Sequence, residues 1–447
     1  MAVVERVEGS GADGSEHGSN LSHVPGAFST VEPMAPPSSH DVHTPSADAP
    51  APRWRATAEA AGLLRHGVPA PTVFETMTSL ALEHDAVNLG QGFPDQDGPD
   101  ELLALAADAV RTGSNQYAPG TGSPALRQAV AEHRRRHWGV DEDPDTQVLV
   151  TTGATEAIAA AVLAFVSPGD EVVTVEPFYD AHAATIALAG GRHVTVPVGP
   201  PSFLPDPDEV AAAFTDRTRM LILNTPHNPT GAVYPRPLLA RLVALCAERD
   251  VLVLTDEVYD HLVFDGEHVT GRAVPGSEDV VLTASSAGKS LAVTGWKVGW
   301  LTGPADLVAA VRAVKQYLTF SSGPAYQLAV AEYLPRADAY LAEQRERYRA
   351  GRDLLVSGLR AAGLDPVVPQ AGYFVTVDLS PWGVEDARTA AEDWIRTAGV
   401  CSIPVSALCR ADGDTMRSWL RLAFCKDASV IGEGMDRLVR HAASLRG

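Results

Sequence analysis

Residues 147–166 read QVLVTTGATEAIAAAVLAFV, an apolar strand pattern that runs through a glycine straight into an apolar helix pattern. The same change of pattern recurs along the chain. The further strand-like runs are residues 171–176, 193–198, 219–224, 251–256 and 279–285. Strands that alternate with helices predict an α/β fold with a mostly parallel sheet, covered by helices on both faces. Ligands of such sheets bind beyond the carboxyl ends of the strands, so the loops after these runs should carry the chemistry.

Charge and composition limit the classes of partner. The 447 residues carry a formal net charge of −21, so no basic surplus exists to neutralise nucleic-acid phosphates or an anionic membrane. No apolar stretch reaches the ~20 residues of a membrane-spanning helix, and the N-terminus lacks the pattern of a signal peptide. The four cysteines, none in a C-x-x-C pair, are typical of reduced thiols. We expect a cytoplasmic protein without nucleic-acid or membrane partners.

The two ends of the chain differ from its middle. Residues 1–52 are rich in Gly, Ser, Pro and Ala and poor in large apolar residues, so we expect a disordered extension. Its four histidines lack the spacing of metal ligands, and we expect no metal site. Residues 331–447 show a long charged helix pattern at 337–362, strand patterns at 372–379 and 419–425, and a final helix. These patterns predict a second, α+β domain.

Lys289 lies in the segment SSAGKS, residues 285–290, at the end of a predicted strand. A lysine held among small and apolar residues is suited to lose its proton and attack an aldehyde. Nearby, Ser286 offers a hydroxyl and Lys297 a second cation, a combination that suits a phosphate group. For this segment alone, an exposed loop lysine is the alternative interpretation.

Two other strand ends carry polar side chains. Asp256 ends the run 251–256, where a buried carboxylate needs a partner such as the protonated nitrogen of a pyridine ring. Tyr259 can donate a hydrogen bond to a phenolic oxygen of the same ring. Asn228, within the segment NTPHNPTG (224–231), offers an amide donor after another strand. The alternatives are an aspartate that caps a turn and an ordinary Pro/Gly turn.

A predicted helix N-terminus and a buried arginine complete the set. Gly153, Ala154 and Thr155 follow a strand and begin a helix, whose free N–H groups and positive dipole end can bind phosphate. Arg421 lies within the apolar segment WLRLAFCKD (419–427) and needs a planar partner such as a carboxylate. An ordinary α/β turn and a structural ion pair are the alternatives.

Together these five segments resemble the class I/II aminotransferases of pyridoxal 5′-phosphate (PLP) fold type I, from about residue 53 onward. The segments NLGQGFPDQDGP (88–99), NQYAPGTGSPALR (115–127), EPFYD (176–180) and GKSLAVTGWKVGW (288–300) are similar to one branch. This branch holds the kynurenine/glutamine transaminases and the actinobacterial N-succinyldiaminopimelate aminotransferases.

The resemblance implies a PLP-dependent transferase fold with two domains. The large PLP-binding domain, residues 90–330, should contain the mostly parallel sheet with its flanking helices. The smaller α+β domain should combine residues 53–89 with residues 331–447. The resemblance also implies a homodimer with its active sites at the interface.

Roles for cofactor-binding residues follow from the same resemblance. Lys289 is expected to bind PLP as a Schiff base and to act as the catalytic residue, moving a proton between substrate and cofactor. Asp256 is expected to pair with the pyridine nitrogen, and Asn228 and Tyr259 with the ring oxygen. Tyr179 should stack on the ring, with Phe178 as the alternative.

Further ligands are implied at the two ends of the bound cofactor. The residues expected at its phosphate are Gly153, Ala154, Thr155, Ser286 and Lys297, with the partner subunit's Tyr117. The residues expected at the substrate are Arg421 and Gly92 for the α-carboxylate, Asn228, and the aromatic side chains Phe74 and Phe320.

The implied activity moves an amino group between an L-amino acid and a 2-oxo acid by a ping-pong mechanism. Ala423, Ser321 and Leu408 depart from residues common in the family and leave the amino donor open. The alternatives are a PLP-dependent cysteine-conjugate β-lyase, a kynurenine/glutamine transaminase, and a non-catalytic regulator. The regulator is disfavoured because residues 1–52 cannot form a helix-turn-helix and the chain is acidic.

Overall fold

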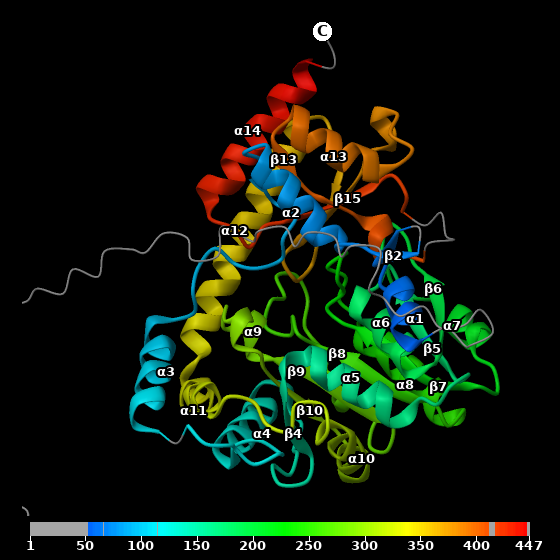
Figure 1. Ribbon diagram of the computed structural model, residues 1–447, viewed down its shortest axis with the longest axis vertical. Coiled ribbons are helices and arrows are strands. Elements are labelled where there is room, and N and C mark those ends of the chain that lie inside the picture. Colours follow the sequence, from blue (N-terminus) through cyan, green and yellow to red (C-terminus); the bar gives the residue numbers. More distant parts are fainter. Residues whose placement is uncertain (1–51, 66, 114, 411–415, 445–447) are drawn as a thin grey trace, which may run out of the picture. The chain divides into compact units, whose positions relative to one another are not determined.

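The computed structural model of the protein describes residues 52–65, 67–113, 115–410 and 416–444 (Figure 1). These residues belong to one structural unit. The expected disordered extension lies outside the described residues, apart from Pro52. Among the described helices, none combines the length and apolar character that crossing a bilayer requires.

A seven-stranded sheet forms the centre of the larger part of the molecule, in the order β4-β10-β9-β8-β7-β5-β6. Its strands are β4 (Val148–Thr152), β5 (Glu171–Glu176), β6 (Arg192–Pro197), β7 (Thr218–Asn224), β8 (Leu252–Asp256), β9 (Val281–Ser286) and β10 (Val298–Thr302). Neighbouring strands from β9 to β6 are parallel. The predicted mostly parallel α/β sheet is confirmed.

Strand β10 is the one strand of this sheet that the sequence analysis did not anticipate. It pairs antiparallel with both β4 and β9. Its sequence, VGWLT, is short and contains a glycine, which weakens a strand pattern. As a result β4 runs in the same direction as the parallel strands, and its carboxyl end lies at the same edge of the sheet.

Alternating side chains of the strands build a core on each face of the sheet. On β7, Met220 packs in the cluster that contains α5 (Gly153–Phe165). Its neighbours Leu221 and Leu223 point the other way, into the cluster that contains α8 (Arg236–Glu248). This alternation with a period of two explains why the strands read as continuous apolar runs. Helices accordingly cover both faces (Figure 1).

The remaining α-helices pack around the strands. They are α1 (Arg53–Ala60), α2 (Val73–Glu83), α3 (Asp100–Thr112), α4 (Pro124–Trp138), α6 (Asp180–Ala189), α7 (Pro207–Ala213), α9 (Ala287–Ser290), α10 (Ala305–Lys315), α11 (Pro324–Tyr333), α12 (Asp338–Ala361), α13 (Ala387–Thr397) and α14 (Ala428–Ser444). Figure 1 shows the long helix α12 running from the neighbourhood of α11 up to α14.

A smaller sheet contains the strands β11, β12, β15 and β14, all paired antiparallel. Their bounds are β11 (Pro366–Val367), β12 (Phe374–Asp378), β14 (Ile403–Pro404) and β15 (Trp419–Ala423). The helix expected at 337–362 and the strands expected at 372–379 and 419–425 correspond to α12, β12 and β15. The predicted α+β character of this part is therefore confirmed.

Residues from before the large sheet join this smaller part. Strand β3 (Val87–Asn88) pairs in parallel with β13 (Val400–Cys401). Met77 and Leu89 share one apolar cluster with Leu438 of α14. Helix α1, by contrast, packs against α6 beside the large sheet. The domain boundaries at residues 89/90 and 330/331 stay predictions.

A close contact between two backbones fixes the start of α5. A Cβ atom at Gly299 of β10 would lie 2.5 Å from the backbone carbon of Gly153 and 2.7 Å from the backbone nitrogen of Ala154. Only glycine permits this approach. Gly153 itself has φ = +70°, in the left-handed region. The two glycines together hold the first turn of α5 against β10.

Replacing Gly299 by alanine should therefore destabilise the protein, because overpacking typically costs about 1–3 kcal/mol. Differential scanning calorimetry should show a lower melting temperature for Gly299→Ala. Gly295→Ala is the matched control, since no atom lies within 4 Å of a Cβ placed there. Equal melting temperatures for the two variants would contradict the argument.

Candidate active site

A cavity of about 400 Å³ lies at the carboxyl ends of β4, β7, β8 and β9, where the fold was expected to place a ligand. It gathers residues that are far apart in the sequence. The predicted site residues that line it are Phe74, Gly92, Gly153, Ala154, Thr155, Tyr179, Asn228, Asp256, Tyr259, Ser286, Lys289, Lys297 and Arg421. Two predicted residues, Tyr117 and Phe320, do not line it.

Lys289 projects into this cavity from the short helix α9. Its Nζ atom donates a hydrogen bond to the hydroxyl of Tyr373, at 2.7 Å. Burial lowers the pKa of Lys289 to about 8, and the nearby cations Lys297 and Arg421 act in the same direction. The amine can therefore lose its proton close to neutral pH, as a nucleophile or general base requires.

Tyr373 is a site residue that the sequence analysis missed. It is fully buried, and its hydroxyl donates to the carbonyl oxygen of Gly92 at 2.5 Å while it accepts from Lys289. Burial raises the pKa of Tyr373 well above its ordinary value, so the phenol stays neutral. It belongs to the strand predicted at 372–379, and no local sequence pattern distinguishes it from an ordinary core residue of that strand.

Asp256 offers an unused acceptor. One carboxylate oxygen, Oδ2, lies 3.3 Å from Nε2 of His182 on α6. The other oxygen, Oδ1, has no hydrogen-bond partner among the described residues, although the side chain is almost completely buried. A buried carboxylate oxygen without a partner is costly, and a protonated ring nitrogen would satisfy it. His182, two residues after the segment EPFYD, was also missed.

The loop after β7 is bound to the end of β8 by Asn224. Its Oδ1 accepts from the backbone N–H of Asn228 at 2.7 Å, and its Nδ2 donates to the backbone oxygen of Asp256 at 2.9 Å. Tyr259 is buried nearby with its ring edge against Tyr373, at 5.2 Å between centroids. Burial raises the pKa of Tyr259, so it remains a hydrogen-bond donor.

A site for a phosphate-like anion lies at the N-terminus of α5. The first turn of α5 offers free N–H groups, and the side chain of Lys297 lies beside this turn, where its Nζ donates to Oγ1 of Thr155 at 3.4 Å. Lys297 is exposed and lines the cavity, so an incoming anion can reach its amine. Ser286, which precedes α9, adds a buried hydroxyl. Backbone dipole, cation and hydroxyl all favour an anion.

The two aromatic candidates for the ring face are separated by the structure. Tyr179 lines the cavity together with Thr155. Phe178 instead packs its ring against His193, with 4.6 Å between the centroids, and does not line the cavity. Of the two, Tyr179 is the residue available to a ligand.

Arg421 of β15 is almost completely buried between two aromatic rings. Its guanidinium lies 3.9 Å from the ring centroid of Phe374 and 5.4 Å from that of Phe74. It donates to Oδ1 of Asn228 at 3.1 Å and to the backbone oxygen of Gly90 at 3.2 Å. Its Nε has no partner among the described residues. Burial lowers the pKa of Arg421 to about 10, so the group stays cationic at neutral pH.

Tyr117 and Phe320 lie together on the surface. Tyr117 is 85% exposed, and its ring packs edge-on against Phe320 with 5.5 Å between centroids. Within one chain neither reaches the cavity. Their expected roles depend on a second copy of the chain and stay predictions.

The chemistry of this set fits PLP. The unpaired Oδ1 of Asp256 suits a pyridinium N–H, and the α5 N-terminus with Lys297 suits a phosphate. Lys289, with its lowered pKa, suits an aldehyde carbon. No metal ion is needed to account for these donors and acceptors.

PLP-free protein should bind PLP covalently at a rate that rises with pH through about 8, because only the neutral amine of Lys289 attacks an aldehyde. Stopped-flow absorbance at a series of pH values measures this rate. Lys289→Ala is the control and should form no covalent adduct. A rate that rises only near 10.5, the ordinary lysine value, would contradict the proposed environment.

Comparisons with known proteins agree with the site. The family model "Aminotransferase class I and II" matches residues 84–438. The chain is 46% identical over 379 residues to "Probable N-succinyldiaminopimelate aminotransferase DapC" of Mycobacterium tuberculosis, covering 83% of this chain and 96% of that relative. It is 36% identical over 394 residues to human kynurenine–oxoglutarate transaminase 1, covering 81% and 93% of the two chains.

Solved structures give the same result. The structure of N-succinyldiaminopimelate aminotransferase from Mycobacterium tuberculosis is similar with a TM-score of 0.83 at 45% identity, covering 88% of this chain and 100% of that one. A methionine aminotransferase from Escherichia coli has a TM-score of 0.80 at 40% identity, covering 83% and 97%. The predicted fold, cofactor and reaction class are confirmed: the chain belongs to the class I and II aminotransferases, which use PLP.

Proposed function

We propose that this aminotransferase moves the α-amino group of an L-amino acid to a 2-oxo acid by a ping-pong mechanism, with the cavity residues in the roles that the sequence predicted. One observation carries the proposal. The amine of Lys289, the unpaired Oδ1 of Asp256 and the unpaired Nε of Arg421 belong to residues that line one cavity. The three groups provide an amine for the aldehyde of PLP, a hydrogen-bond acceptor for its ring nitrogen and a cation for the carboxylate of the substrate.

When bound, PLP supplies an electron sink for the negative charge that develops at the substrate Cα. Asp256 keeps the ring nitrogen protonated, and His182 holds the carboxylate in place through its other oxygen. Tyr259 would hold the ring oxygen by donating to it, and so would the Nδ2 of Asn228, since the Oδ1 of Asn228 accepts from Arg421. The first turn of α5 binds the phosphate with Lys297 and Ser286.

Lys289 acts as the general base and acid. A pKa of about 8 leaves a useful fraction of the amine neutral near neutral pH, so Lys289 can take the proton from the substrate Cα and return it to the carbon that carries the cofactor's aldehyde. Tyr373 is a positioning residue, because its hydroxyl accepts from the Lys289 amine at 2.7 Å. The bond from Tyr373 to Gly92 fixes this hydroxyl.

Arg421 binds the substrate α-carboxylate. The rings of Phe374 and Phe74 keep water from the guanidinium and restrict its plane. A Cβ at Gly92 would lie 2.5 Å from the Phe374 ring, so glycine at this position brings a backbone N–H close to the same place. The carboxylate thus meets a cation and a backbone donor at one end of the cavity.

For the substrate, we favour an N-succinyldiaminopimelate-like amino donor. The support is the similarity to the Mycobacterium tuberculosis relatives that carry this name, which extends over 96% of the curated sequence and 100% of the solved chain. Methionine and kynurenine are the competing donors, because relatives named for them are 40% and 36% identical to this chain. A cysteine-conjugate β-lyase would use the same lysine and is the competing reaction.

A single-turnover screen of amino donors tests the assignment. The PLP absorbance of the purified enzyme should be converted fastest by N-succinyl-L,L-diaminopimelate, more slowly by methionine and kynurenine, and not at all in Lys289→Ala. Faster conversion by another donor would refute the substrate assignment and leave the aminotransferase intact. Release of a thiol, pyruvate and ammonia from a cysteine S-conjugate, without an oxo-acid acceptor, would identify the lyase.

Arg421→Lys should reduce kcat/KM roughly 100-fold, equivalent to about 3 kcal/mol, because lysine cannot present the planar fork to a carboxylate. Steady-state kinetics with the best donor measures the loss, and the PLP absorbance should stay normal. Arg396→Lys is the matched control, since Arg396 is an exposed arginine of α13 that pairs with Glu392. An unchanged kcat/KM in Arg421→Lys would contradict this role.

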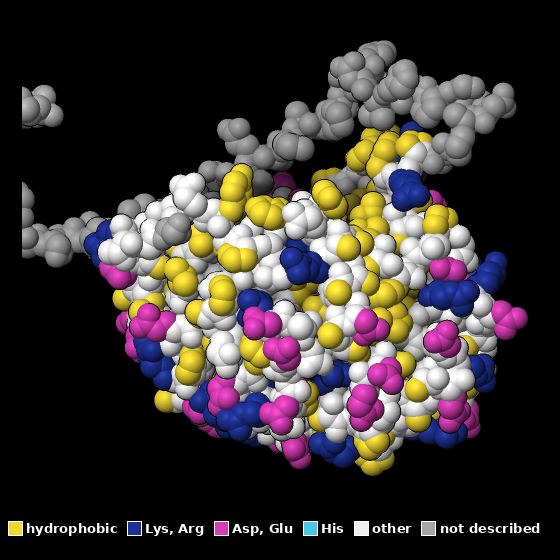
Figure 2. Space-filling model, turned by 90° about the horizontal axis from the view of Figure 1, so that it is seen from below, with side chains coloured by type: hydrophobic (Ala, Val, Ile, Leu, Met, Phe, Trp, Pro, Cys, Tyr) yellow, Lys and Arg dark blue, Asp and Glu magenta, His cyan; other side chains and the backbone are white. Residues whose placement is uncertain are grey.

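We further propose a cytoplasmic homodimer with the domain division given above. Support for the dimer comes from the exposed apolar side chains near the site, Tyr117, Tyr317, Leu318 and Phe320. The four cysteines, all buried and unpaired, support a reducing location. Figure 2 shows Lys and Arg scattered among Asp and Glu over the face that it displays, which supports small-molecule substrates without nucleic acid.

A further inference from the structure

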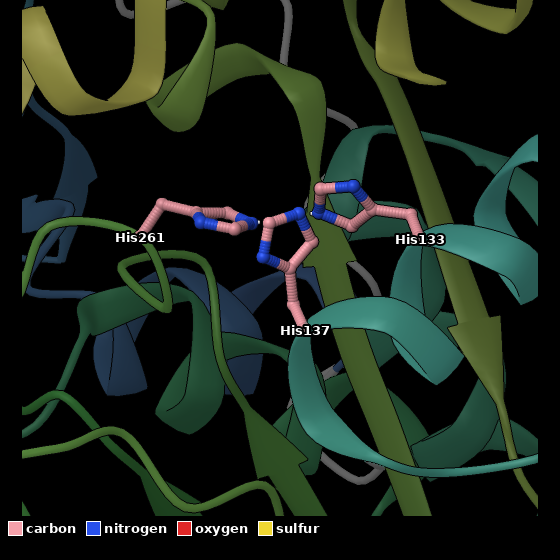
Figure 3. Close-up of side chains that lie close together, drawn as sticks. All are labelled: His133, His137 and His261. Carbon is pink, nitrogen blue, oxygen red and sulfur yellow. Dashed lines mark hydrogen bonds between the residues drawn. The ribbon is translucent and has the colours of Figure 1, made fainter. Parts of the chain in front are cut away.

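Three histidines converge at the side of the large sheet, away from the cavity. His133 and His137 are four residues apart on α4 and therefore lie on one face of the helix. His261 follows the turn after β8 and meets them from the other side. Figure 3 shows the three rings with a nitrogen of each turned toward the group. One ligand atom from each lies within 4.8 Å of the other two.

The spacing of the rings is close to that of imidazoles on one metal ion. The ring centroids are 4.3 Å apart for His133 and His137, 4.8 Å for His133 and His261, and 4.9 Å for His137 and His261. Three imidazoles on a tetrahedral Zn²⁺, with Zn–N bonds of about 2.0–2.1 Å, have centroids about 5 Å apart. Small ring rotations would replace the present 2.7 Å hydrogen bond between Nε2 of His133 and Nε2 of His261 with metal bonds.

The surroundings provide a further oxygen and a route of entry. Oδ1 of Asp338, at the start of α12, lies 3.2 Å from Nε2 of His137. This carboxylate offsets the charge of Arg136, which also contacts His137. His133 is buried, whereas His137 and His261 are partly exposed, so an ion can reach the group from solvent. Burial also lowers the pKa of His133, and the neutral imidazole is the form that binds metals.

We propose that His133, His137 and His261 bind one divalent transition-metal ion of the Zn²⁺ class, with Asp338 or water as the fourth ligand. Imidazole nitrogen is a preferred ligand of such ions, and three histidines with one further oxygen complete a tetrahedral site. The sequence analysis expected no metal site and did not consider these three histidines. Local spacing does not reveal the group, because His261 is distant along the chain from the pair on α4. Tyr259 lies in the same turn as His261, directly after β8, so the ion would connect α4 to the loop of the active site.

Zinc binding to the full-length, tag-free, PLP-loaded enzyme tests the proposal. After chelator treatment and dialysis, isothermal titration with Zn²⁺ should show one site per chain, and Co²⁺ should give the visible absorption of tetrahedral coordination. His137→Ala should weaken binding by roughly 100-fold or more, because one of three protein ligands is lost. Asp338→Asn should weaken it by about tenfold.

Two controls separate this site from other histidines. His84→Ala replaces an exposed histidine outside the group and should bind Zn²⁺ like the wild type. A variant with His17, His23, His40 and His43 all changed to asparagine should also retain the site. An unchanged melting temperature and PLP absorbance of metal-free His137→Ala show that the variant is folded.

The proposal is overturned by either of two results. One is the absence of Zn²⁺ binding in the wild type beyond what the four N-terminal histidines account for. The other is a folded His137→Ala variant that binds Zn²⁺ as tightly as the wild type. Zinc should also raise the melting temperature of the wild type and of His84→Ala, and leave that of His137→Ala unchanged.

Discussion

The site depends on holding charged groups together where little water can solvate them. Asp256 and Arg421 are almost completely buried, and the amine of Lys289 is desolvated enough to lower its pKa. An uncompensated buried charge costs several kcal/mol, so each of these groups needs a fixed polar neighbour. The neighbour that forms a hydrogen bond is His182 for Asp256, Asn228 for Arg421 and Tyr373 for Lys289. Among the described residues, Oδ1 of Asp256 and Nε of Arg421 still lack a hydrogen-bond partner, so a ligand with a donor for one and an acceptor for the other would be stabilised in the cavity.

The two halves of the site come from different sheets. The groups proposed for the cofactor follow strands of the seven-stranded sheet, whereas Arg421 and Phe374 belong to strands of the smaller sheet. The hydrogen bond from Arg421 to Asn228, at 3.1 Å, crosses between them and couples the position of the substrate cation to the loop after β7. A movement of one sheet relative to the other would therefore affect Arg421 and Asn228 together.

Much of this could be predicted from the sequence, and the reasons for the misses are physical. Lys289, Asp256, Asn228 and Gly153 follow apolar strands, and parallel topology brings such positions to one edge. Strand β10 was missed because Gly299 interrupts a short pattern, yet that glycine is required by the contact with Gly153. Tyr373 and His182 carry no local signal, since a buried tyrosine or histidine usually reads as core. Their relevance comes only from partners that are distant along the chain.

The connection from β9 to β10 has a consequence for how such a site can change. These antiparallel neighbours are joined by residues 287–297, a stretch that carries Lys289 and ends at Lys297. One amine faces the proposed aldehyde end of the cofactor and the other its phosphate end, and the sheet anchors the stretch at both sides. The connection therefore fixes the distance between the amines of Lys289 and Lys297. Inserting residues into it would displace the amine at the aldehyde end of the cofactor and the amine at its phosphate end. Arg421 and Phe74, which we assign to the substrate, lie on β15 and α2 and therefore outside this connection.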